Sequence, residues 1–344
     1  MAYPLIIFGA GASHDYSPLG KLAPLTKELV ENQFLYEDLL EKYRGAANVL
    51  ADLIQRVKQG NKTFEQELTA MKERTKDSKQ MRAHFSALEF YLRDLFKKIS
   101  NEHLKHIPRD IFLKMRQANN YKRILNRIDT YTAGRACVIT FNYDSLFENN
   151  LYKAPIIMND YIANDLKIIK VHGSHDWVYI KRSSSMRFHE SEAKNSFEWC
   201  LENPDFLDEL RTDGRPIHEQ ELQRNNTKSD FADFPAIAIP LIGKDSYICP
   251  ESHIQILTQV LPKIDRVLVI GWRAGDPLLL DILKSHLQEM GYTIMVVSDT
   301  LDGAHKIGAT IKTALGIDKS YITAIGGGFS DFMANETSET FFAQ

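Results

Sequence analysis

The sequence predicts an α/β protein with a Rossmann-like, doubly wound parallel sheet of about six or seven strands and a large α-helical insertion. Short apolar runs rich in β-branched residues recur along the chain. They are continuous rather than alternating, which is typical of parallel strands buried on both faces. Helical patterns separate several of these runs, and strand–helix–strand repetition favours parallel pairing. The expected strands are Leu5–Phe8, Cys137–Phe141, Ile168–Val171, Ala236–Ile239, Val267–Ile270, Ile294–Val297 and Tyr321–Ala324.

The segments between these strands predict a single domain of 344 residues with two insertions. The core consists of residues 1–24, 133–180 and 234–330. Residues 25–132 are expected to form a helical insertion, because stretches such as Phe85–Ile99 place apolar residues at helical spacing. Residues 181–233 are polar and turn-rich, which favours an irregular excursion with a short helix near Phe197–Leu201. The tail, residues 331–344, is expected to be a frayed end or a contact to a partner.

Composition argues against several classes of function. A formal net charge of −3 gives no reason to expect direct nucleic-acid binding, and no apolar run approaches the roughly 20 residues of a membrane-spanning helix. The three cysteines, Cys137, Cys200 and Cys249, form no CxxC pair, so no zinc ribbon and no other metal site is expected. Sparse cysteines and an N-terminus without a basic region or cleavage site predict a cytoplasmic protein. Neither a GxSxG elbow nor a phosphate loop ending in GK[ST] occurs, so serine hydrolases and the corresponding NTPases find no support.

The first candidate site segment is LIIFGAGAS, in which the first strand runs into a glycine turn. Glycines let backbone N–H groups approach a pyrophosphate at the start of a helix. The residues expected to line this site are Gly9, Ala10, Gly11, Ala12 and Ser13. Ser13 could cap the helix or bond a phosphate oxygen. His14 stands where a GxGxxG fingerprint has its third glycine, so a tight turn without a ligand is the alternative.

The second segment is VITFNYD, where Asn142 and Asp144 follow the second strand. Ligands of open α/β folds bind at the carboxyl edge of the sheet, where these side chains are expected. The amide of Asn142 both donates and accepts hydrogen bonds, so it could hold a ribose hydroxyl or a water. The alternative is that Asn142 or Asp144 only caps the next helix.

The third segment is IIKVHGSHDW, where His172 ends a strand and Gly173 and Ser174 follow. Histidine is the side chain best matched to proton transfer near neutral pH, and the glycine leaves space beside the imidazole. A metal site built on His172 and His175 is disfavoured, because the segment predicts a strand and a turn instead of a helix that aligns both rings. A structural histidine is the other alternative.

The fourth segment is VLVIGWRAGDP, a second strand–glycine–helix turn. Gly271 provides the turn, Trp272 could lie against a planar ring, and Arg273 could bind a phosphate or a carboxylate. Asp276 followed by Pro277 is typical of an N-cap and the first helical residue. The alternative is a capped helix without a ligand. Further on, Asp299 could bind ribose hydroxyls or cap a helix.

These four segments, in this order, resemble the bacterial sirtuin-like domains of antiphage defence systems, which belong to the sirtuin superfamily. The matching motifs are GAGAS at 9–13, FNYD at 141–144, KVHGSHDW at 170–177 and IGWRAGDP at 270–277. The resemblance implies that Asn142 and His172 are the catalytic pair, that the first glycine loop lines the NAD phosphates and that Gly271 faces the cofactor. Trp272 and Arg273 depart from the Tyr and Ser that are usual in the family.

The resemblance implies a function as well as a fold. The cysteine-rich zinc module of deacetylating sirtuins is absent from the sequence, which favours water over acyl-lysine as the acceptor. The expected activity is therefore NAD+ hydrolase (NADase), with NAD as substrate and nicotinamide and ADP-ribose as products. In such relatives NAD+ depletion is an antiphage response, regulated by assembly. A homo-oligomer and a separately encoded partner such as a HerA-type ATPase are expected.

Three other functions stay open at this point. The domain could bind NAD or ADP-ribose without hydrolysis and act as a scaffold, or it could be an NAD-dependent protein deacylase. A Rossmann dehydrogenase ranks last. It needs an acidic residue about 20 positions after the glycine loop, and Glu28 and Glu31 lie there in a helical context.

Overall fold

The computed structural model describes residues 3–25, 28, 36–60, 62–101, 107–182, 195–224, 231–241, 246–287, 293–317 and 322–343. The chain forms two compact units. The first unit comprises Met1–Leu25, Ile107–His172 and Gly243–Gln344. The second unit comprises Thr26–His106 and Gly173–Ile242. None of the described helices combines the length and the apolar character needed to cross a bilayer.

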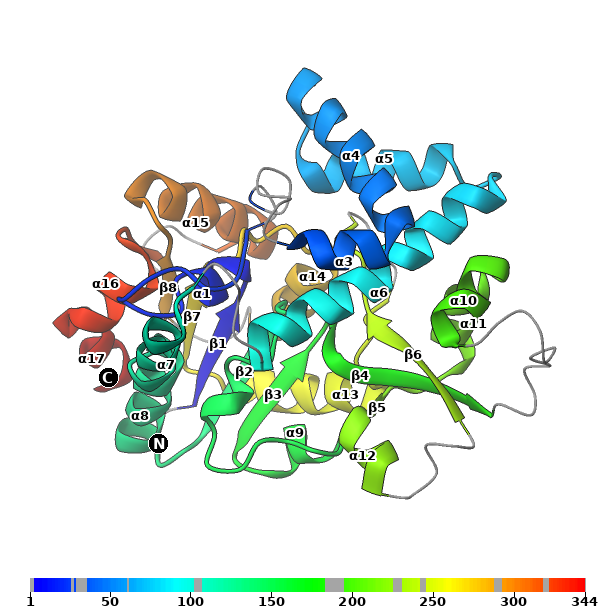
Figure 1. The fold of residues 1–344 in the computed structure, drawn as a ribbon. Coiled ribbons are helices and arrows are strands. Elements are labelled where there is room, and N and C mark those ends of the chain that lie inside the picture. Colours follow the sequence, from blue (N-terminus) through cyan, green and yellow to red (C-terminus); the bar gives the residue numbers. More distant parts are fainter. Residues whose placement is uncertain are drawn as a thin grey trace. The chain divides into compact units, whose positions relative to one another are not determined.

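The first unit is built on a six-stranded parallel sheet with the strand order β3-β2-β1-β7-β8-β9 (Figure 1). Its strands are β1 (Pro4–Phe8), β2 (Ala136–Thr140), β3 (Leu166–Lys170), β7 (Arg266–Ile270), β8 (Thr293–Val297) and β9 (Ile322–Ile325). Phe8 pairs with Thr140 and Ile270, and Thr140 pairs with Lys170, so the carboxyl ends of four strands lie level. The strand order reverses direction between β1 and β7. This confirms the predicted doubly wound sheet and places its switch point there.

Helices cover the sheet because its central strands have no solvent-exposed face. All five residues of β1, β2 and β7 are buried. Helix α15 packs against β8 and β9, whereas α9 and α13 pack against β3. The helices of this unit are α1 (Ala10–His14), α7 (Arg109–Gln117), α8 (Asn120–Thr132), α9 (Asp160–Ala163), α13 (Glu251–Val260), α14 (Pro277–Leu287), α15 (Leu301–Leu315), α16 (Gly328–Ala334) and α17 (Glu336–Ala343), with 3₁₀ turns η2 (Glu148–Asn150) and η4 (Leu261–Lys263).

The second unit combines helices with a three-stranded antiparallel sheet in the order β5-β4-β6. Its strands are β4 (Gly173–Arg182), β5 (Ile217–His218) and β6 (Phe231–Ile237). Its helices are α3 (Glu37–Lys42), α4 (Arg44–Gln59), α5 (Phe64–Arg74), α6 (Lys79–Asn101), α10 (Ser196–Glu202), α11 (Phe206–Asp213) and α12 (Glu219–Arg224). The 23-residue α6 packs against α4, α10, β4 and β6 (Figure 1). The helical expectation for Phe85–Ile99 is thus confirmed.

Two expectations about the chain after residue 180 are wrong. The run Ala236–Ile239 was assigned to the parallel sheet, but β6 pairs antiparallel with β4 in the second unit. A continuous apolar run indicates burial on both faces and does not fix the direction of pairing. Residues 181–233 are not an irregular excursion where they are described, since they contain α10, α11, β5 and α12. The short helix expected near Phe197–Leu201 is confirmed as α10.

The end of the chain folds instead of fraying. Helix α17 packs on α8 and α16, and Phe341 and Phe342 are buried. The guanidinium of Arg266, on β7, donates to the carbonyl of Phe341 at 2.7 Å. The sequence grouped residues 107–132 with the helical insertion, whereas α7 and α8 belong to the first unit. Helical periodicity gave no sign of this division.

Candidate functional site

Two glycine turns meet at the switch point of the sheet. Gly9 N donates to Ile270 O at 3.0 Å, and Gly11 N donates to Gly271 O at 3.2 Å. A Cβ on Gly9 would lie 2.5 Å from Trp272 Cα, and one on Gly271, whose φ is +63°, would lie 2.5 Å from Ala12 N. Only glycine permits this approach of backbone to backbone.

This contact changes the interpretation of the first glycine loop. Gly9, Gly11 and Ala12 all donate their N–H groups to carbonyls of the protein. These three donors are therefore used inside the fold, and the glycine pattern is explained by packing of the two turns. Ala10, the first residue of α1, is exposed at this edge, so its placement near a phosphate stays a prediction.

A buried polar cluster lies beside this turn; we call Ser13, Tyr121, Asn142 and Asp144 the Asn142 cluster. Asn142 Nδ2 lies 2.9 Å from Ser13 Oγ and 3.3 Å from Tyr121 Oη, and the two hydroxyl oxygens are 2.8 Å apart. All four side chains are buried. Ser13 lies inside α1, where Gly9 is the N-cap, so the expectation that Ser13 caps this helix is wrong.

Asn142 Nδ2 donates to both hydroxyl oxygens of the cluster, and either of the two hydroxyls can donate to the other. The amide orientation follows: Nδ2 faces the cluster, and Oδ1 accepts no hydrogen bond from the part of the chain that the structure describes. Asn142 is thus held with an acceptor available.

Burial controls the titration of this cluster. Desolvation raises the pKa of the Asp144 carboxyl above its ordinary value, against the opposing effects of the Lys170 ammonium and the Ser13 hydroxyl. Desolvation also raises the pKa of Tyr121 well above its ordinary value, and the charge on Asp144 adds to this rise. Tyr121 therefore stays a protonated donor at neutral pH.

A buried ion pair supports the loop that carries Asn142 and Asp144. Lys170 Nζ lies 2.7 Å from Glu148 Oε1 and donates to the carbonyl of Asp144 at 2.6 Å. Asp144 Oδ1 accepts from Leu146 N at 3.1 Å within a turn. The next helical segment is the short η2, so neither Asn142 nor Asp144 caps an α-helix there.

His172 lies in an aromatic setting at the end of β3. The ring of Phe141 makes an edge contact with the imidazole at 5.0 Å between centroids, and the ring of Tyr143 stacks on it at 6.2 Å. Phe141 also stacks on Trp272 at 5.1 Å. The fourth segment is thereby joined to the second and third, as expected for one edge of the sheet.

Asp276 connects His172 to helix α14. Its Oδ2 lies 3.5 Å from His172 Nε2, and its Oδ1 accepts from Leu279 N at 2.8 Å, which confirms the predicted N-cap. Tyr247 Oη donates to the same Oδ1 at 2.8 Å. Burial would raise the pKa of Asp276, but the nearby imidazole of His172 and the hydrogen bonds from Leu279 N and Tyr247 Oη hold it below its ordinary value. Asp276 is therefore a carboxylate at neutral pH.

The remaining candidates are less closely joined to this site. Arg273 is exposed. Gly173 and Ser174 open strand β4 and belong to the second unit, where Gly173 adopts a φ of +78°. Thr300, not Asp299, caps α15. Within the described ranges, no group of three or more His, Cys, Asp or Glu side chains is placed to hold a metal ion.

Sequence reasoning missed four residues of this site: Tyr121, Glu148, Lys170 and Tyr247. Lys170 gave a signal, since a lysine inside the apolar run Ile168–Val171 needs a buried anion. Tyr121 and Tyr247 gave none, because each reaches its partner across a long stretch of sequence.

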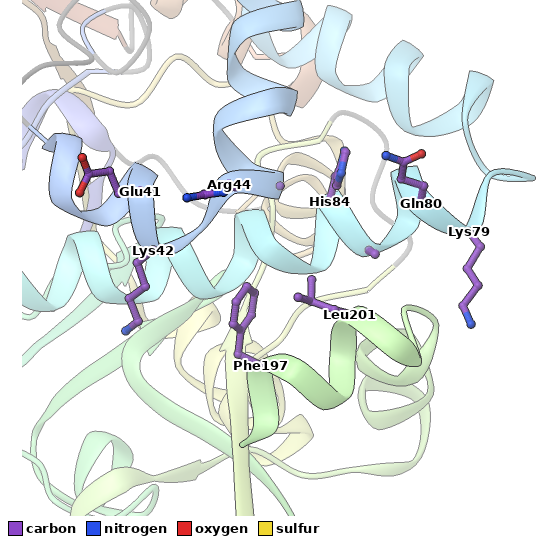
Figure 2. A pocket seen from close by; sticks show the side chains of 10 residues that line it. Glu41, Lys42, Arg44, Lys79, Gln80, His84, Phe197 and Leu201 are labelled. Atoms are coloured by element: carbon purple, nitrogen blue, oxygen red, sulfur yellow. The ribbon is translucent and has the colours of Figure 1, made fainter. Parts of the chain in front are cut away.

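A separate cavity of about 710 Å³ lies in the second unit (Figure 2). Phe197 and Leu201 on α10 line one side, opposite His84 and Gln80 on α6. Its other lining residues are Glu41, Lys42, Arg44, Gly45, Lys79 and Ala83. None of the residues predicted from the motifs lines it, so this cavity is not part of the predicted site.

Comparison with known proteins gives only a weak structural similarity. No protein-family model and no curated protein sequence matches the chain. A structure of Sir2Tm bound to a propionylated peptide is 10% identical with a TM-score of 0.41, and the match covers 98% of this chain and 93% of that one. A Sir2 homologue in complex with NAD is 13% identical with a TM-score of 0.37, covering 91% and 89% of the two chains.

Proposed function

We propose that the first unit binds NAD+ at the carboxyl edge of its sheet and hydrolyses the bond between nicotinamide and ribose. One observation carries the proposal. Asn142 and His172, which closely follow the neighbouring strands β2 and β3, both lie at this edge, one with an oriented amide and the other beside a carboxylate. The switch point between β1 and β7 is where open α/β sheets bind dinucleotides. The four sequence motifs support NAD+ as the dinucleotide.

Hydrolysis of the bond between nicotinamide and ribose requires the protein mainly to position the reactants and to accept a proton. The glycosidic bond breaks with its electron pair leaving on nicotinamide, and the oxygen of a water forms the new bond to the ribose carbon. Asn142 Oδ1 accepts a hydrogen bond from that water or from a ribose hydroxyl. His172 accepts the proton that is released. Positioning supplies most of the acceleration, and the proton transfer supplies about 10²- to 10⁴-fold.

We further propose a regulated, cytoplasmic enzyme that acts by NAD+ depletion in antiphage defence. This part rests on the sequence motifs and on the hazard of an unrestrained NADase to its own cell. Control by homo-oligomer assembly, or by a partner such as a HerA-type ATPase, fits that need.

The test is nicotinamide release from NAD+, followed by chromatography over a range of protein concentrations and with the partner ATPase added. The wild type should release nicotinamide, and His172→Ala and Asn142→Ala should lower the release by about 10²- to 10⁴-fold. Thr63→Ala, which removes the N-cap of α5 in the second unit, is the matched control and should retain activity. Full turnover in both site variants would contradict the assignment. Release that depends on an acyl-lysine peptide would identify a deacylase, and tight NAD+ binding without release in any assembly would identify a scaffold.

A further inference from the structure

We infer that Asp276 is a positioning residue for His172, and that Tyr247 in turn fixes Asp276, so that these side chains determine which imidazole nitrogen faces the substrate. The catalytic consequence rests on the proposed function. The positioning itself is a statement about the protein alone and can be tested without turnover.

The two oxygens of Asp276 have different partners. Oδ1 accepts two hydrogen bonds, from Leu279 N and from Tyr247 Oη, each at 2.8 Å. Two donors on one oxygen prevent rotation of the carboxylate. Oδ2 is consequently directed at His172 Nε2, 3.5 Å away.

A carboxylate selects the tautomer of the imidazole beside it. Because Asp276 at neutral pH only accepts hydrogen bonds, it favours the form of His172 with its proton on Nε2. Nδ1 is then the basic nitrogen. An aspartate orients the catalytic imidazole of serine hydrolases in the same way. The distance of 3.5 Å is long for a hydrogen bond, and catalytic contacts of this kind commonly tighten only in the substrate complex.

Within the described residues of the first unit, few other charged groups could orient the imidazole of His172. The ammonium of Lys170 is taken up by Glu148 and the carbonyl of Asp144, and Arg273 is exposed. Among the described residues, the titratable and charged groups on or next to the surrounding elements include Tyr143 and Asp144 after β2, Glu148 on η2, Lys167 and Lys170 on β3, Tyr247 and Cys249 before α13, Arg266 on β7, and Arg273 and Asp276 after β7. Asp276 is the carboxylate for which an ion-pair distance to the imidazole is observed.

The decisive variant is Asp276→Asn. Asparagine caps helices as well as aspartate does, and its oxygen can keep the bonds to Leu279 and Tyr247. Only the atom facing Nε2 changes, from an acceptor to an NH₂ donor. Tyr247→Phe is the second variant, because it leaves the carboxylate in place and removes one of its two anchors.

The measurement is ¹⁵N NMR of the full chain labelled at its eleven histidines, with His172 assigned from the spectrum of His172→Gln. In the wild type we expect the Nε2–H tautomer. In Asp276→Asn we expect the Nδ1–H tautomer and a titration midpoint lower by about one pH unit. Tyr247→Phe should shift the midpoint in the same direction by less, and Thr63→Ala should not shift it.

The rate of nicotinamide release provides an independent test. Asp276→Asn should lower kcat for nicotinamide release by at least about 100-fold with little change in KM, and move the acid limb of the pH profile to lower pH. An unchanged tautomer and midpoint in Asp276→Asn would overturn the inference, as would an unchanged midpoint in Tyr247→Phe if Asp276→Asn does not fold. A shifted tautomer in a protein that never cleaves NAD+ would uphold the positioning and contradict only the proposed function.

Discussion

The two halves of the candidate site are built differently. The Asn142 cluster is closed: its contacts are 2.8 to 3.3 Å long, and Asn142, its most accessible member, is 6% exposed. The His172–Asp276 pair is open: the two side chains are 16% and 13% exposed, their contact is 3.5 Å long, and aromatic rings surround the imidazole. The comparison indicates that one half is organised in advance, whereas the other has room to adjust when a ligand arrives.

Substitution of His172 or Asn142 should cause the largest loss of activity, and the two variants should differ in stability. His172→Ala should lower nicotinamide release by about 10²- to 10⁴-fold and change the free energy of unfolding by less than about 1 kcal/mol. Asn142→Ala should lose as much activity and also about 1–3 kcal/mol of stability, because Ser13 and Tyr121 lose their donor. Chromatography and urea unfolding check both. Equal stability losses in the two variants would contradict the comparison.

The next largest loss of stability is expected from breaking the ion pair between Lys170 and Glu148, which supports the loop of the Asn142 cluster. Lys170→Met removes the ammonium that faces the buried carboxylate of Glu148, and breaking a buried pair in this way costs about 3–5 kcal/mol. The unfolding midpoint in urea should fall accordingly. The double variant Lys170→Met, Glu148→Leu is the control and should recover most of the loss. If the single variant is as stable as the wild type, the pair does not support the loop.

A smaller loss is expected from the cluster itself. Tyr121→Phe removes one hydroxyl that bonds both Ser13 and Asn142, and this should lower the free energy of unfolding by about 1–2 kcal/mol. Tyr131→Phe on the same helix is the matched control and should change stability by less than about 0.5 kcal/mol. Equal effects at the two positions would show that the cluster is not closed.

The smallest expected effects concern the pH dependence of stability, which should have opposite signs for Asp276 and Asp144. Asp276 has a folded-state pKa below its unfolded value, so it contributes stability above about pH 4 that is lost as pH falls through the folded pKa. Asp144 has a raised folded-state pKa, so its contribution to stability declines as pH rises from about 4 toward that pKa. Urea unfolding of Asp276→Asn and Asp144→Asn between pH 3 and 7 should show opposite slopes relative to the wild type. Slopes of one sign would contradict the pKa directions.

The sequence predicted the sheet and the edge where the candidate residues lie, because buried parallel strands and the turns after them leave a strong local pattern. Asn142, His172, Gly271 and Asp276 follow directly from that pattern. It could not reveal Tyr121 or Tyr247, whose partners are 108 residues and 29 residues away along the chain. It also assigned Ala236–Ile239 to the wrong sheet, since hydrophobicity does not encode strand direction.

The glycine loops show a second limit. The same sequence pattern occurs where a glycine leaves space for a phosphate and where it leaves space for another segment of backbone. The structure shows that Gly11 and Gly271 each leave space for the backbone of the other. Distinguishing the two cases requires knowledge of which strands are neighbours, and that is a property of the topology.

The central position of β1 has a consequence for how the protein is made. This strand leaves the ribosome before its partners β2 and β7, which follow more than 130 and 260 residues later. At typical rates of synthesis β7 emerges roughly 10 to 50 s after β1. Pairings between such distant segments also form slowly, because long loops must close first. The strand that carries the first glycine turn therefore stays apolar and unpaired until its two partner strands have been synthesised. Its protection during that time is a requirement that the finished fold imposes on the cell.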